Sequence, residues 1–144
     1  MATLNADNYA KMIAVPQEQI PAGEVSGKVR ISYDEITLSA ELAVNDLINV
    51  CAPIPANARI VDAVVKSPSL GTTGILKLGI SSDDDYFIAS HDAGGAAACT
   101  RMANEAGMLA QDSDDLLQPI LKCTEASDAG TGEKIQVAIH WVLE

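Results

Sequence analysis

Apolar residues recur with a period of two over several short stretches, which is the pattern of β-strands. The stretch near the C-terminus alternates most regularly, because the apolar residues on one face of an extended chain are Ile135, Val137, Ile139, Trp141 and Leu143. Residues 58–66 instead carry β-branched side chains on both faces, which is typical of a strand covered on both sides. Six further strands are predicted over residues 28–33, 36–38, 42–50, 75–80, 86–90 and 116–123.

Several local features refine this pattern. The apolar phase changes at Asp34 and Glu35, which predicts a bulge or a turn. Pro119 cannot donate a ladder hydrogen bond, so residues 116–123 are expected at a sheet edge. Residues 91–111 are rich in Ala, Met and Gly without a clear period and predict a long loop. About eight short strands separated by turn residues predict an all-β fold, an antiparallel β-sandwich or jelly roll.

The chain divides into two unequal parts. Residues 28–144 are predicted to form the single β-sandwich or jelly-roll domain. Residues 1–27 are interrupted by Pro and Gly, and cannot form a core of their own. They are either a disordered leader or an extended N-terminal arm that becomes ordered on a partner, and in an assembly protein the arm is favoured. Its isolated apolar residues are Met12, Ile13, Val15 and Ile20.

The charge excludes one class of partner. The 144 residues include 20 acidic and nine basic residues, for a formal net charge of −11. Because nucleic-acid binding relies on Lys and Arg to neutralise phosphates, a nucleic-acid partner is not expected. No apolar run reaches membrane-spanning length and no signal peptide is recognisable, so we expect synthesis in the cytoplasm without membrane insertion. The three cysteines lack a metal-binding spacing and are expected to be reduced thiols.

Candidate chemistry is sparse, and neither an enzyme nor a cofactor nor a metal is expected. His91 and His140 lack any metal or catalytic motif, and two histidines are too few for a jelly-roll metal enzyme. A thiol–imidazole pair of His91 with Cys99 is the only nucleophilic site to consider, and the spacing does not favour it. The acidic runs 83–85 and 112–115 are solvated loop tips or loops that bind Ca²⁺, an alternative that stays open.

Several short motifs follow one another in a fixed order between residues 22 and 90. They are Ala22-Gly23-Glu24, Gly27-Lys28-Val29-Arg30, Asn45-Asp46-Leu47-Ile48, Ile54-Pro55-Ala56-Asn57-Ala58, Ser69-Leu70-Gly71, Leu76-Lys77-Leu78-Gly79 and Asp83-Asp84-Asp85-Tyr86-Phe87. In this order they resemble small virion structural proteins of tailed bacteriophages. Ile54 stands where those proteins usually have leucine, and the resemblance is weaker after residue 90.

The resemblance implies a decoration or cement protein on the outside of the capsid. Such a protein binds the major capsid protein and stabilises the head without enzymatic activity, often as a homo-oligomer such as a trimer. Met12, Ile13, Val15 and Ile20 are then the capsid contacts of the arm. The alternative is a phage appendage or fibre module that binds a receptor or carbohydrate through residues 81–95 and 105–115. That alternative has few aromatic side chains to stack on sugars.

Overall fold

A computed structural model of the chain describes residues 16, 19, 28–102 and 115–143. The predicted arm lies almost wholly outside the described residues. The described part contains eight strands and no helix, so it has no helix that could cross a membrane. The strands are β1 (Arg30–Thr37), β2 (Leu47–Asn49), β3 (Ala58–Ser67), β4 (Ile75–Ile80), β5 (Asp83–Asp92), β6 (Ala98–Arg101), β7 (Pro119–Glu125) and β8 (Lys134–Leu143).

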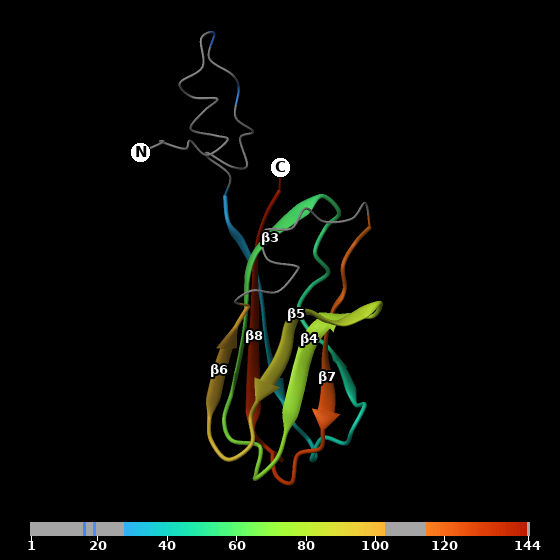
Figure 1. Cartoon of the computed structure of the whole chain (residues 1–144), viewed down its shortest axis with the longest axis vertical. Coiled ribbons are helices and arrows are strands. Elements are labelled where there is room, and N and C mark those ends of the chain that lie inside the picture. The colour runs from blue at the N-terminus through green and yellow to red at the C-terminus, as the bar shows by residue number, and fades with distance from the viewer. Residues whose placement is uncertain (1–15, 17–18, 20–27, 103–114, 144) are drawn as a thin grey trace, which may run out of the picture.

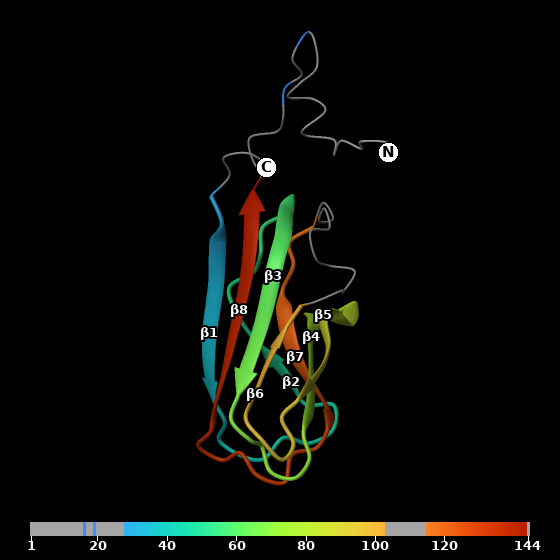
Figure 2. The same cartoon turned by 60° about the vertical axis from the view of Figure 1, so that its left-hand side comes forward.

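The strands form two four-stranded antiparallel sheets packed face to face (Figure 1). One sheet has the order β1-β8-β3-β6, which is seen face on in Figure 2, and the other has the order β2-β7-β4-β5. The pairs β1–β8, β2–β7, β3–β6 and β4–β5 are those of one long antiparallel hairpin wound into two layers. This is the topology of an eight-stranded jelly roll, so the predicted all-β sandwich is confirmed.

The core between the sheets is mainly aliphatic, as expected for a chain with one Phe and one Trp. The alternation near the C-terminus is confirmed for Ile135, Val137, Ile139 and Trp141, which are all buried on the inner face of β8. It fails for Leu143 at the end of the strand, which is 37% exposed. Each fully buried aliphatic side chain contributes about 1.5–3 kcal/mol relative to its exposed state. The prediction that residues 58–66 form a strand is correct, but the prediction that both faces of this strand are buried is wrong. Its inward side chains are buried, whereas outward Val64 stays partly accessible.

Strand β1 differs from its prediction. Its register with β8 runs from Arg30 to Thr37 without a shift, so neither a bulge nor a turn lies at Asp34. Asp34 instead faces the interior side, where its carboxylate accepts the N–H of Cys51 at 3.0 Å. The apolar phase changes because Ile31 and Tyr33 lie on the outward face of β1, whereas Ile36 lies on its inward face. In this sheet, a register shift occurs instead in β3, between Ile60 and Asp62, where β3 pairs with β8.

Two other predictions fail for reasons of tertiary pairing. The expected loop 91–111 contains the end of β5 and all of β6, which pairs with β3. Residues 116–123 were expected at an edge, but β7 lies between β2 and β4. Pro119 is tolerated because it is the first residue of β7, where a missing N–H interrupts the ladder least.

Candidate functional site

The described residues contain one buried polar network between the sheets, centred on His91 of β5. Its Nε2 lies 2.8 Å from the Ser67 hydroxyl at the end of β3, and its Nδ1 lies 2.9 Å from the Thr100 hydroxyl of β6. The imidazole is completely buried. Burial lowers the pKa of His91, and the nearby carboxylate of Asp92 opposes this only in part. The network therefore holds a neutral imidazole that ties three strands together.

Ser67 and His91 are as close as a catalytic nucleophile and its general base, but solvent and substrate cannot reach them. The Ser67 side chain is 2% exposed and His91 is 0% exposed, so no substrate can reach either group. Cys99 lies on the opposite face of β6 from Thr100, because successive residues of a strand alternate. The hypothesis that Cys99 pairs with His91 is therefore wrong. The hydroxyl of Thr100 contacts the imidazole instead. Sequence reasoning missed this hydroxyl pair because it joins three separate strands.

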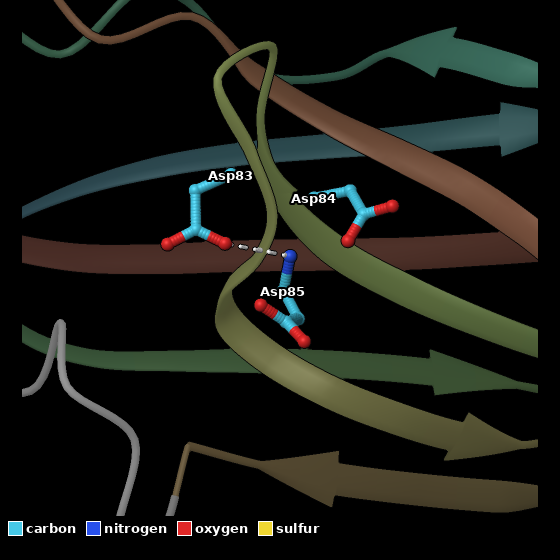
Figure 3. A group of neighbouring side chains, drawn as sticks. All are labelled: Asp83, Asp84 and Asp85. Carbon is cyan, nitrogen blue, oxygen red and sulfur yellow. Dashed lines mark hydrogen bonds between the residues drawn. The ribbon is translucent and has the colours of Figure 1, made fainter.

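The acidic run forms the start of β5 (Figure 3). Carboxylate oxygens of Asp83, Asp84 and Asp85 lie within 4.8 Å of one another. Lys122 at 2.6 Å and Lys77 at 3.2 Å contact Asp84, and both lower the pKa of its carboxyl. Asp83 has its pKa raised, chiefly by the neighbouring carboxyl of Asp85. Two lysine ammonium groups thus already neutralise the central carboxylate, and oxygen ligands for a hard cation remain only at the tip.

The cysteines are all free. Burial raises the pKa of Cys51 to about 12, with a smaller contribution from Asp34. Burial also raises the pKa of Cys123. Neither side chain is a thiolate at neutral pH, so neither has the properties of a nucleophilic or metal-binding cysteine. Cys99 is the exposed thiol.

Several residues predicted as sites lie outside the described residues. These are the arm residues Met12, Ile13, Val15 and Ile20, together with positions 112–114 of the second acidic run. Of the two loops assigned to the appendage alternative, 105–115 lies outside the described residues except for residue 115, and 81–95 is shorter than expected. Residues 83–92 form β5, which leaves a two-residue turn before the strand and a short connection to β6.

The outward face of the β1-β8-β3-β6 sheet is the most distinctive exposed surface of the described residues. Val29, just before the edge strand β1, alternates with Ile31 and Tyr33 of that strand, and each of the three residues is more than half exposed. The strand register places Ile31 beside His140, and Tyr33 beside Ala138. Of these two neighbours on β8, only Ala138 is apolar, so the apolar strip is confined mainly to the sheet edge. Alternation alone predicted that these three residues share a face, but not that the face is the exposed one.

Polar and charged groups lie on the same face, in a pocket that begins at Val29 itself. A pocket of about 320 Å³ is lined by Val29, Val61, Asp62, Arg101 and His140. The guanidinium of Arg101 forms an ion pair with Asp62, and its Nε donates to that carboxylate at 3.0 Å. The pairing covers Asp62, while the Arg101 side chain itself stays 70% exposed. Such a combination of apolar strip and exposed guanidinium is typical of protein interaction surfaces.

Comparison with known proteins shows that this chain shares its fold with chains of solved capsid structures, at low sequence identity. No family model and no curated protein matches the chain. Among solved structures, a chain of the capsid asymmetric unit of cyanophage Pam1 matches with a TM-score of 0.76 and 17% identity, over 100% of both chains. A chain of the capsid of Ralstonia phage GP4 matches with a TM-score of 0.70 and 22% identity, over 88% of this chain and 92% of that one.

A third capsid structure has the same fold. A chain of the acid-stable capsid of Helicobacter pylori bacteriophage KHP30 matches with a TM-score of 0.60 and 13% identity, over 80% of this chain and 87% of the other. The resemblance to phage virion structural proteins, which the sequence motifs indicated, is thus confirmed at the level of fold. The described jelly roll is a fold that chains of three phage capsids share.

Proposed function

We propose that this chain is a non-enzymatic structural protein of a phage virion, which binds the major capsid protein and stabilises the head as a decoration or cement protein. The observation that carries the proposal is the match over the full length of both chains to a chain of a phage capsid. A match that covers all of both compared chains supports a similar task for this chain, although fold alone does not fix function.

The chemistry of the described residues is consistent with a task that involves no catalysis. The one serine–histidine pair at bonding distance is sealed between the sheets, and the buried thiols are protonated. A protein that reinforces a shell works by binding the assembled state, and its stabilisation grows with the number of contacts made together. Binding to the exterior of the shell after synthesis in the host cytoplasm needs only a stable, soluble domain and a contact segment.

We assign the shell contact to the N-terminal arm, residues 1–27, through Met12, Ile13, Val15 and Ile20. Isolated apolar residues in a segment without its own core gain burial only on a partner surface. The body attached to this arm is a homo-oligomer such as a trimer in the proposed state, because several arms held together bind more tightly than one.

The test is co-sedimentation with shells assembled from the major capsid protein of the same phage. We expect the full chain to bind saturably and a variant lacking residues 1–27 to stay in the supernatant while its circular dichroism remains that of the full chain. A matched pair of full-length variants separates apolar contact from length. Met12→Ser, Ile13→Ser, Val15→Ser and Ile20→Ser together should abolish binding. The conservative set Met12→Leu, Ile13→Val, Val15→Ile and Ile20→Val should retain it. Undiminished binding by the truncated chain contradicts the role of the arm.

A further inference from the structure

The turn between β4 and β5 folds back across the outward face of the β2-β7-β4-β5 sheet. Gly79 faces outward, because its neighbour Leu78 is buried in the core. A Cβ added at Gly79 would lie 2.3 Å from the backbone oxygen of Asp83, so the backbone of the turn lies directly on this glycine. The register of β4 with β5 shifts twice before the turn, and in Figure 1 the tip of this hairpin bends toward β7.

Two lysines anchor the turn in this position. Lys77 of β4 and Lys122 of β7 are direct neighbours in the strand register, on the outward face of the sheet. Their ammonium groups both contact the carboxylate of Asp84, at 3.2 Å and 2.6 Å respectively. The carboxylate between them offsets the repulsion of two like charges on neighbouring strands. The turn therefore forms a wall on the outward face of the sheet.

This wall and the edge strand β2 border a groove of about 740 Å³. One side consists of residues 81–84 of the turn, and the other of Asn45, Leu47 and Asn49. Ile120 and Lys122 of β7 lie between the two sides. Sites for small organic ligands typically have volumes of about 300–1,000 Å³. The groove therefore fits a small organic ligand and is much larger than a single ion requires.

Most of the polar groups along the groove are neutral. The amides of Asn45 and Asn49 both donate and accept hydrogen bonds, as do the hydroxyls of Ser81 and Ser82. None of these four side chains forms a hydrogen bond within the part of the chain that the structure describes. All four are therefore available to a ligand.

The charged and apolar side chains narrow the class of ligand. The groove is lined by two carboxylates, Asp83 and Asp84, and by the ammonium group of Lys122, for a net charge of −1. A strongly charged ligand of either sign would therefore lie close to a group of its own charge. Leu47 is 63% exposed and offers an aliphatic surface, and none of the described residues that line the groove is aromatic. A neutral ligand with many hydroxyl groups and aliphatic C–H groups fits all of these features.

We propose that this groove binds a neutral sugar, whose hydroxyls bond to the four amide and hydroxyl side chains and whose C–H groups lie against Leu47. Without an aromatic ring to stack on, one site should bind a monosaccharide with a Kd on the order of 1 mM. Several copies held together on a shell bind a polysaccharide more tightly than one copy does. That gain rests on the proposed function, whereas the sugar site itself does not.

The test begins with beads coated with the full chain, which are applied to an array of neutral, acidic and amino-containing glycans. The neutral glycan that binds best is then titrated into the soluble full chain, and binding is followed by the NMR signals of the backbone amides. We expect binding to neutral glycans, with the largest shifts at residues 45–49 and 81–84. Binding to no neutral glycan, or largest shifts away from these residues, would overturn the inference.

A pair of double variants tests the polar side chains. Asn49→Ala with Ser82→Ala should raise the Kd at least about tenfold, because two hydrogen bonds to the sugar are lost. The matched control is Thr37→Ala with Ser90→Ala, which changes two exposed polar residues outside the groove and should leave the Kd unchanged. Equal affinities of the two double variants would contradict the assignment.

Asp83→Asn separates a sugar from a basic segment of a protein partner. The substitution removes the charge and keeps the hydrogen-bonding capacity, so sugar binding should persist. An oligolysine peptide that shifts the groove signals in the wild type and not in Asp83→Asn, with no effect of any sugar, would assign the groove to a basic partner and overturn the inference. If sugar binding fails while the full chain still pellets with shells, this inference fails and the proposed function stands.

Discussion

Acid should destabilise this protein through His91 before it protonates most carboxylates. The imidazole is fully buried between the hydroxyls of Ser67 and Thr100, and burial lowers its pKa in the folded state. The unfolded chain has a histidine pKa of about 6.5 and takes up the proton first. The stabilisation by a neutral His91 is therefore fully present above the unfolded pKa. It is lost as the pH falls below about 6.5, until the folded pKa is reached.

The size of the effect follows from linkage. The upper limit is set by protonation of the unfolded histidine alone, which lowers the free energy of unfolding by about 1.4 kcal/mol between pH 7.5 and pH 5.5. For a domain of this length, that loss lowers the melting temperature by about 5 °C. The residue that removes the titration while keeping hydrogen-bonding groups is glutamine. His91→Gln should be less stable at neutral pH and should lose this part of the pH dependence.

The assay is urea unfolding followed by tryptophan fluorescence, at several pH values between about 5.5 and about 7.5. The comparison is between slopes against pH, so a uniform loss of stability in the variant does not affect it. His140→Gln, measured in parallel, shows how much of the dependence belongs to the other histidine. If wild type and His91→Gln lose the same free energy over this interval, the buried neutral imidazole does not control acid stability and the reasoning is wrong.

Two further predictions concern packing and thiol chemistry. Gly79→Ala should lower stability by about 1–3 kcal/mol, because a Cβ at this position would lie 2.3 Å from the backbone oxygen of Asp83 in the β4–β5 hairpin. Thermal unfolding measures this, and an unchanged melting temperature would show that the hairpin adjusts freely. Ellman's reagent at about pH 8 should react rapidly with one thiol of the native protein, Cys99, and with all three after denaturation. Rapid reaction of two or three thiols in the native state would mean that Cys51 or Cys123 is accessible.

The sequence was most informative where the two faces of a strand differ in burial. Ile135, Val137 and Ile139 alternate with polar residues, and burial of one face alone decides their orientation. The same reasoning placed β4 at residues 75–80 with its bounds unchanged. Local alternation is enough in these strands, because no distant polar partner competes with apolar burial.

Strand β1 shows why the orientation of its side chains could not be predicted from the sequence. The polar side chains of Ser32 and Asp34 take the inward side because they bond to groups far away in the sequence. Trp141 Nε1 donates to the Ser32 hydroxyl at 3.1 Å, and the Cys51 N–H donates to Asp34. The apolar residues between them then face outward. No local pattern contains these bonds, so the outward-facing strip could not be recognised as a surface.

The hydroxyl partners of His91 were beyond prediction for a related reason. Ser67 is 24 residues from His91 in sequence, and Thr100 lies within residues 91–111, whose composition predicts a loop. Once β6 is known to pair with β3, alternation places Thr100 inward and Cys99 outward. The pairing of β6 with β3 therefore decides which side chains surround His91. They are the hydroxyls of Ser67 and Thr100, which form a structural network, and not the thiol of Cys99.

The central claim is that this chain is a component of a phage shell, and the number of copies bound per shell tests it most directly. Increasing amounts of the full chain are mixed with shells of the major capsid protein that lack it, and the pelleted ratio is measured. The account predicts a plateau at a fixed number of copies per capsid subunit, reached with a single affinity. A protein that stays in the supernatant, or a bound amount that rises without a plateau, would contradict it.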